Sequence, residues 1–392
     1  MFGSIYVGLS GLNAYSRGLQ QISNNVTNLN ASGFKGSTVS FTDLVGINGN
    51  GGASYSGGSG GGGNGVEIGA TRIDFKQGEL RQTDRDLDLA IDGSGFLMLM
   101  RGDEVLYTRT GSFEVNKDGF IVLAGTEYRL ATLDDSGRPV SLSIDASRTS
   151  TPKATTTIKF ADNLSSTATT YGISDVKVYD ASGGEHVWQV KFTKAEGSLN
   201  EWSVEITDDK AKTVGTKTLK FIQGQVDPTT NKLLFEDSAA GLSVTLDFSE
   251  NVTSFSAGTV STLRSASVDG YKVGAITSII VNDKGKLEIG YSNEQKKELG
   301  SIAIADFRDP QALEQRSGGL FHDTGLAQRE LTSTEDKRVG RVLSRRLEAS
   351  NVDLAKAFGE LILIQRGFQA SSQIISVSND MIQQLFGMRG QG

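Results

Sequence analysis

Both ends of the chain carry an apolar repeat with a seven-residue period, and the middle of the chain does not. Near the N-terminus the repeat comprises Ile5, Leu12, Leu19 and Val26, followed at three residues by Tyr15, Ile22 and Leu29. Near the C-terminus it comprises Leu347, Leu354, Leu361, Phe368, Ile375 and Ile382, with Phe358, Ile364 and Leu385 beside them. Such a repeat predicts helices that pack against another helix along their whole length.

The residues around both repeats are almost uncharged. Arg17 is the only charged residue between Ser4 and Asn30, and Arg366 is the only one between positions 361 and 379. A two-stranded coiled coil ordinarily carries Glu and Lys beside its seam, because those positions meet water. We therefore expect further copies of the chain to enclose these helices, as in a polymer. An intramolecular helical hairpin is the alternative, but it would not require an uncharged outer face.

Isolated helices of this kind should be weakly ordered. Packing, rather than intrinsic propensity, supplies most helix stability, so we expect about 35 residues at each end to be disordered in a monomer and ordered in the polymer.

Composition restricts the possible functions. A chain of 392 residues is expected to form two or three domains, and its net charge of −7 argues against nucleic-acid binding. The absence of cysteine excludes disulfides and thiolate chemistry, and the only two histidines, His186 and His322, are interpreted as incidental. No catalytic site, metal or cofactor is predicted. Neither a membrane-spanning run nor a Sec-type signal peptide is recognisable, so no membrane insertion is expected.

Glycine and polar residues mark the segments next to each helix. Ten of the eighteen residues in 48–65 are glycine, which is typical of a flexible linker. The segment lacks the GK[ST] sequence of a phosphate-binding loop, so nucleotide binding is disfavoured. We interpret 31–65 and 311–346 as an arm with hinges, in which the hinge glycines are Gly33, Gly51, Gly52, Gly61 and Gly62.

Between these segments the apolar period is two, which indicates strands. The fold class predicted is α+β, mainly β. The N- and C-terminal helices (1–30 and 347–392) pair as a coiled coil at one pole. Two antiparallel β-domains follow, the first from 66–150 and 263–310 and the second, 151–262, inserted in it. Lys117-Asp118-Gly119 predicts a hairpin turn. Trp188 and Trp202 are expected to anchor the core of the second domain.

Three local patterns of charged and polar residues bear on function. Asp84, Asp86 and Asp88 alternate, but we interpret them as solvated carboxylates on one strand face rather than a calcium site. Arginines at 338, 341, 345 and 346 have helical spacing and predict a solvated basic face or a contact with an acidic neighbour. Ser350 and Asp353 have the spacing of a capping box before the last helix, which is expected to end near Phe386.

Three long motifs also resemble a known family. LSGLNAYSRGLQQISNNVTNLNASGFKGS is similar to the N-terminal signature of bacterial flagellar rod, hook and hook-associated proteins. LEASNVDLAKAFGELILIQRGFQASSQIISVSNDMIQQLF is similar to their C-terminal signature. DFKQGELRQTDRDLDLAIDGSGF and YTRTGSFEVNKDGF resemble their first β-domain, and FADNLSS with VKVYDASGGEHVWQVKFTK resembles the middle domain of the hook-forming members.

The resemblance implies a structural subunit of the bacterial flagellum rather than an enzyme. It implies a polymer of many copies that forms a curved tube outside the cell, attached to the basal body, and passes motor torque to the filament as a universal joint. The implied partners are the distal rod protein, the hook cap, the hook–filament junction protein and the flagellar type III export apparatus.

Two alternative functions remain compatible with parts of the sequence. A distal rod subunit or hook-associated protein of the same family is disfavoured by the large β insert. A secreted β-rich binding or hydrolytic module should show convergent carboxylates or histidines, and none is evident.

Overall fold

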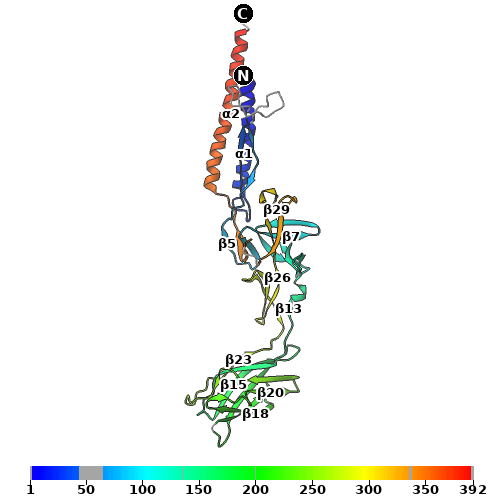
Figure 1. The fold of residues 1–392 in the computed structure, drawn as a ribbon, viewed down its shortest axis with the longest axis vertical. Coiled ribbons are helices and arrows are strands. Elements are labelled where there is room, and N and C mark those ends of the chain that lie inside the picture. The colour runs from blue at the N-terminus through cyan, green and yellow to red at the C-terminus, as the bar shows by residue number, and fades with distance from the viewer. Residues whose placement is uncertain (1, 44–64, 135, 199, 335–337, 390–392) are drawn as a thin grey trace. The chain divides into compact units, whose positions relative to one another are not determined.

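The structure, a computed structural model, describes residues 2–43, 65–134, 136–198, 200–334 and 338–389. Two long helices, α1 (Phe2–Thr27) and α2 (Leu354–Arg389), lie at the two ends of the chain. The described residues between them form strands and two short 3₁₀ turns, η1 (Asp145–Ser147) and η2 (Pro310–Ala312) (Figure 1). The fold is therefore mainly β with two terminal helices, as the sequence predicted.

The chain divides into two compact units. Unit 1 comprises Met1–Asp145, Ile279–Glu288 and Glu298–Gly392, and unit 2 comprises Ala146–Ser278 and Ile289–Lys297. The strands of unit 1 are β1 (Ser37–Thr38), β2 (Phe41–Asp43), β3 (Val66–Ile68), β4 (Arg72–Ile73), β5 (Leu80–Gln82), β6 (Asp88–Asp92), β7 (Phe96–Arg101), β8 (Glu104–Thr108), β9 (Thr110–Val115), β10 (Ile121–Leu123), β11 (Arg129–Leu133), β12 (Pro139–Ser141), β27 (Ala303–Phe307), β28 (Leu313–Arg316), β29 (Leu320–Asp323), β30 (Arg329–Ser333), β31 (Arg341–Ser344) and β32 (Arg346–Glu348).

The strands of unit 2 are β13 (Thr149–Ser150), β14 (Thr157–Asn163), β15 (Thr170–Tyr179), β16 (Glu185–Lys194), β17 (Glu201–Thr207), β18 (Thr213–Ile222), β19 (Gln225–Val226), β20 (Lys232–Asp237), β21 (Leu242–Asp247), β22 (Val252–Thr253) and β23 (Arg264–Val268). The division between the units falls within the strands β24 (Gly274–Val281), β25 (Lys286–Tyr291) and β26 (Lys296–Ser301).

Unit 1 is built on a branched sheet whose main order is β28-β29-β8-β7-β11-β10-β9-β6-β31. Aromatic rings form its core: the ring of Phe96 meets those of Phe307 and Phe321 edge-on, with centroids 5.4 and 5.6 Å away. The predicted hairpin is present, since β9 and β10 pair antiparallel around Gly119, whose φ of 75° favours glycine.

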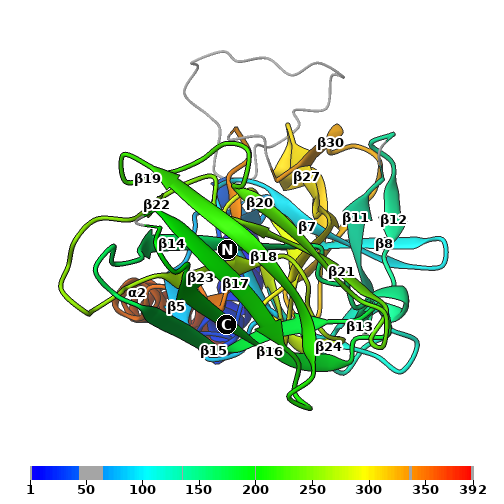
Figure 2. The same ribbon diagram turned by 90° about the horizontal axis from the view of Figure 1, so that it is seen from below.

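Unit 2 is a sheet of order β15-β16-β17-β18-β19-β22-β14-β21-β20, in which β15 to β18 form an antiparallel meander (Figure 2). Alternate residues of β17 are buried, as expected for strands with one face on a core. Trp188 and Trp202 are completely buried in that core, which confirms their predicted role. Pairing is not antiparallel throughout, because β14 runs parallel to β21 and β22.

Several sequence predictions were wrong about the residues before α2. The strands β28 to β31 join the sheet of unit 1, although 311–346 was expected to form a polar hinge. Leu347 lies in β32 and pairs with Arg81 of β5, so it does not belong to a helix. The helix begins at Leu354, and its cap is Asp353 rather than Ser350. The Asp353 carboxylate accepts hydrogen bonds from the backbone N–H groups of Ala355 (2.8 Å) and Lys356 (3.1 Å).

The predicted aspartate and arginine faces were also wrong. β6 begins only at Asp88, and this side chain is buried, so the three alternating aspartates do not share a solvated strand face. The arginines predicted on a helical face lie instead in or beside strands. Arg345 pairs with Asp86 at 2.6 Å and Arg341 with Asp92 at 3.5 Å, so local acidic residues of the same chain neutralise them.

Candidate assembly site

The two terminal helices pack side by side in opposite directions (Figure 1). Small residues make this close approach possible. A Cβ atom added to Gly8 would lie 2.7 Å from the Ile375 side chain, and one added to Gly11 would lie 2.5 Å from the Ser371 hydroxyl. Further along the pair, one added to Gly18 would lie 3.0 Å from the Ile364 side chain. Glycine at these places removes the side-chain volume that would push the two backbones apart.

The predicted seam residues are divided between buried and exposed positions. Ile22 is 1% exposed and Ile364 is 7% exposed, and both belong to the core of the helix pair. The half-buried members are Ile5, Leu12, Leu19, Val26, Leu29, Leu361, Ile375 and Ile382. In contrast, Leu354, Phe358 and Phe368 are exposed. The exposed three are available for contacts outside this copy of the chain.

Of the four residues that form the most buried line of α2, sequence reasoning identified only Ile364. Ala357, Ile364, Ser371 and Ser378 follow one another at seven-residue steps, and all four are buried. Because alanine and serine do not count as large apolar residues, the neighbouring line of leucine, phenylalanine and isoleucine dominated the pattern. A search for small residues at the same period would have found this line.

A second, largely apolar line on α2 has no partner among the residues that the structure describes. We call it the α2 stripe; its members lie three or four residues apart and are all exposed: Leu363, Arg366, Ala370, Ile374, Val377 and Met381. Leu363 is 70% exposed and Met381 is 51% exposed. Of the twenty exposed large apolar side chains in the part of the chain that the structure describes, twelve lie on α1 and α2. A helix with apolar lines on two sides is suited to burial on both sides.

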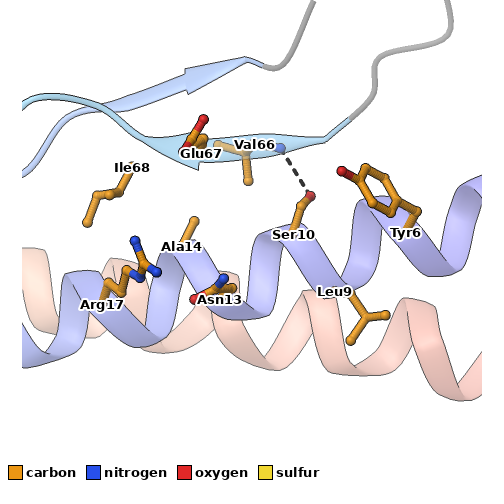
Figure 3. A pocket seen from close by; sticks show the side chains of 9 residues that line it. All are labelled: Tyr6, Leu9, Ser10, Asn13, Ala14, Arg17, Val66, Glu67 and Ile68. Atoms are coloured by element: carbon orange, nitrogen blue, oxygen red, sulfur yellow. Dashed lines mark hydrogen bonds between the residues drawn. The ribbon is translucent and has the colours of Figure 1, made fainter. Parts of the chain in front are cut away.

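A groove lies between α1 and the ribbon formed by β2 and β3 (Figure 3). The hydroxyl of Ser10 accepts a hydrogen bond from the backbone N–H of Val66 at 3.2 Å and so ties the ribbon to the helix. Phe41 of the ribbon packs against Tyr15 of α1, with ring centroids 5.2 Å apart. Exposed Tyr6 and Leu9 line the groove together with Arg17 and Glu67; we call it the α1–β3 groove.

Two asparagine side chains connect the base of the helix pair to the extended segments of unit 1. The amide of Asn25 donates to the carbonyl of Ser37 (2.7 Å) and accepts from its N–H (3.0 Å). The amide of Asn351 accepts from the N–H of Gly36 (2.8 Å) and donates to the carbonyl of Asp74 (2.6 Å). Both residues lie in the motifs that carry the family resemblance, and here they position backbone rather than a ligand.

A buried ionic cluster lies beside these amides. The ammonium of Lys35 and the carboxylate of Glu348, both with completely buried side chains, are 2.6 Å apart. Lys35 also donates to the carbonyl of Lys76 at 2.7 Å, and the Glu348 carboxylate accepts from the N–H of Gly78 at 2.8 Å. Burial lowers the pKa of Lys35 below its ordinary value, and the nearby Glu348 carboxylate only partly opposes this effect.

Arg109 supplies a second cation to the same carboxylate. Its Nε lies 3.4 Å from Oε2 of Glu348, close enough for charge attraction, although the two atoms do not form a hydrogen bond. The guanidinium donates to the carbonyl of Gly95 at 2.5 Å and to that of Gly93. The ionic cluster thus joins the segment that leaves α1, the strand that leads to α2, and the central sheet of unit 1.

Of the predicted hinge glycines, only Gly33 can be placed. Its φ is 71°, and an added Cβ atom would lie 2.9 Å from the Thr110 side chain, so both conformation and space favour glycine there. Gly33 also donates its N–H to the carbonyl of Glu348 at 2.8 Å, so it is tied to the ionic cluster. Gly51, Gly52, Gly61 and Gly62 lie outside the described residues.

Neither a metal site nor a membrane span is found in the part of the chain that was placed. No three or more His, Asp or Glu residues gather there as metal ligands. None of the helices there combines the length and hydropathy needed to cross a bilayer. Paired apolar helices, two β units and apolar surface concentrated on the helices together define a structural subunit built for association.

Comparison with known proteins identifies the family. Three family models match: "Flagellar hook protein FlgE/F/G D1 domain" at residues 90–163, "Flagellar basal body protein FlaE D2 domain" at 142–271 and "Flagellar basal body rod FlgEFG protein C-terminal" at 343–388. The flagellar hook protein FlgE of Treponema pallidum is 27% identical, with 99% of this chain and 100% of that protein covered. The flagellar hook protein FlgE of Salmonella typhimurium is 29% identical, with 97% of this chain and 98% of that protein covered.

Among solved structures, the Helicobacter pylori flagellar hook protein FlgE2 matches with a TM-score of 0.48 and 13% identity, over 69% of this chain and 99% of that one. On the family models and the full-length relatives, the chain belongs to the family of bacterial flagellar hook proteins. That family is one of structural proteins of the flagellum, not of enzymes.

Proposed function

We propose that the protein is the structural subunit of a bacterial flagellar hook and assembles with copies of itself into a tube. The observation that carries this proposal is the α2 stripe, an exposed and largely apolar line on a helix whose other side is already buried against α1. Burying such a surface is favourable by about 25 cal/mol per Å² of apolar area, and copies of the same chain provide a regular way to bury it. The family relationship supports the same function.

In the proposed assembly the two helices act as a coiled coil in the inner part of the tube, and the unit formed largely by 151–262 is inserted in the first β-domain and lies outside it. The division into terminal helices, arm, first β-domain and inserted β-domain stays a proposal. So do export through the flagellar type III apparatus, a location outside the cell, and contacts with the distal rod, hook cap and hook–filament junction proteins. The protein is proposed to have no catalytic role.

The hook would act as a universal joint if its inner helices stay locked while outer parts slide. Glycine-rich sequence leaves a backbone with many conformations, so segment 48–65 is the proposed hinge, with Gly51, Gly52, Gly61 and Gly62 in it. Shortening this segment should change hook curvature in electron micrographs and leave assembly intact. Unchanged curvature would argue against the hinge.

A single charge on the α2 stripe tests the proposed function. Val377 is 45% exposed, so Val377→Glu should leave the monomer folded while placing a carboxylate in the contact between copies. Purified wild-type protein, salted out, should form regular tubes in the electron microscope, and the variant should stay monomeric. Val260→Glu, at an apolar residue of unit 2 that is 66% exposed, is the matched control and should assemble normally. Normal tubes from Val377→Glu would overturn the proposal.

A further inference from the structure

The α2 stripe carries one isolated cation. Arg366 lies among Leu363, Ala370 and Ile374, and no acidic residue occurs on α2 between Glu360 and Asp380. If the stripe is enclosed by other copies, this guanidinium must meet an acceptor, because an unpaired charge away from water is costly. A carboxylate on the surface that covers the stripe would satisfy it.

The α1–β3 groove offers both apolar surface and such a carboxylate. Tyr6 is 60% exposed and Leu9 is 54% exposed, so the groove has apolar area that none of the described residues covers. Glu67 is exposed on β3 and points away from α1 at the rim of the groove (Figure 3). No ion pair joins it to Arg17 across the groove among the residues that were placed, so its carboxylate is available.

The net charges around the α1–β3 groove and on the α2 stripe are opposite in sign. Asp43, which pairs with Val66 across the ribbon, and Glu67 are both acidic, and Arg17 is the one basic residue that lines the groove. Among the lining residues the charges of Glu67 and Arg17 balance, and Asp43 on the adjacent strand adds one negative charge beside the groove, opposite in sign to the one positive charge of the α2 stripe. Interfaces use such complementarity to set register and to exclude wrong partners.

We propose that the α2 stripe of one copy lies in the α1–β3 groove of a second copy, with Arg366 paired to Glu67. This inference rests on the proposed function and specifies which two surfaces meet. The two surfaces are different parts of one molecule, so the contact is heterologous and leaves a free stripe and a free groove on every pair. A heterologous contact of this kind propagates into a helical array.

Cross-linking between two single-cysteine variants tests the contact directly, because the natural chain has no cysteine. Glu67→Cys and Arg366→Cys proteins are mixed, assembled by salting-out and treated with a short bis-maleimide. A cross-linked dimer should form in the mixture, and each variant alone should give none. A dimer that links two Glu67→Cys chains, or no dimer in mixed tubes, would overturn the proposal. Glu114→Cys, at an exposed glutamate of β9, replaces Glu67→Cys in the control mixture and should not cross-link.

Charge exchange provides an independent readout. Glu67→Arg and Arg366→Glu should each raise the critical concentration for assembly about tenfold or more, and the double variant should return toward the wild-type value. Glu114→Arg, with the same change in net charge, should have little effect. Failure of the double variant to recover would contradict the pairing. Failure of the wild-type protein to assemble would instead contradict the proposed function, so the two failures are distinguishable.

Discussion

The buried ionic cluster shows how much can depend on single residues. The carboxylate of Glu348 contacts both Lys35 and Arg109, and all three side chains are buried. Removing one partner of a buried ion pair is far more damaging than removing a surface pair, because the remaining charges stay buried without compensation.

Glu348→Gln should therefore lower the free energy of unfolding of unit 1 by about 3–5 kcal/mol. Urea unfolding followed by circular dichroism measures this change. Glu79→Gln is the control, because Glu79 and Arg81 form an exposed pair that should contribute well under about 1 kcal/mol. Equal effects of the two substitutions would contradict the importance of burial.

The same cluster predicts a direction for the pH dependence of stability. Burial lowers the pKa of Lys35, so between the folded-state pKa and the ordinary pKa of lysine the unfolded chain binds more protons than the folded one. In that window the contribution of Lys35 to unfolding free energy must rise with pH; below the folded-state pKa it is constant.

Urea unfolding of wild-type protein and of Lys35→Met, repeated from neutral pH to the ordinary pKa of lysine, isolates this contribution. The stability of the wild type relative to the variant should increase with pH. A decrease would mean that the pairing with Glu348 outweighs burial and that the pKa of Lys35 is raised.

At the scale of elements, the helix pair depends on glycine at its contact line. Gly8→Val should cost about 1–3 kcal/mol of helix-pair stability, because its Cβ atom would meet the Ile375 side chain and the carbonyl of Ser371 at 3.3 Å. Hydrogen exchange of α1 and α2 in the assembled protein is the measurement. Gly359→Ala is the matched control, since nothing lies within 4 Å of its added Cβ atom. It should leave protection unchanged or raise it, because alanine favours helix by about 1 kcal/mol.

Sequence patterns correctly predict secondary structure where the pattern repeats within a single helix or strand. The two helices and the alternation of β16 and β17 were predictable, because both patterns repeat within one element. The start of α2 was not: Ser350 and Asp353 both have capping chemistry, and the segment around Leu347 continues the heptad. The pairing of Leu347 with Arg81 places Leu347 in a strand rather than in the helix. This contact joins residues that are far apart in the chain.

For the whole molecule, we expect assembly to order both ends. Hydrogen exchange should show weak protection of about 35 residues at each end in a monodisperse monomer and strong protection in tubes, because most helix stability comes from packing. The cores of the two units should be protected in both states and serve as the internal control. Full protection of both ends in the monomer would show that the intramolecular pair suffices.

Local periodicity and residue chemistry determined much of this protein from the sequence alone: helices at both ends, strands between them, and no thiol chemistry. Only the tertiary structure decided which line of α2 is buried, that β28 to β31 join the sheet of unit 1, and that Lys35, Arg109 and Glu348 meet. The physical reason is the separation along the chain of the residues that interact. A repeat is set by neighbours a few residues away, whereas these three results depend on which distant segments pack together.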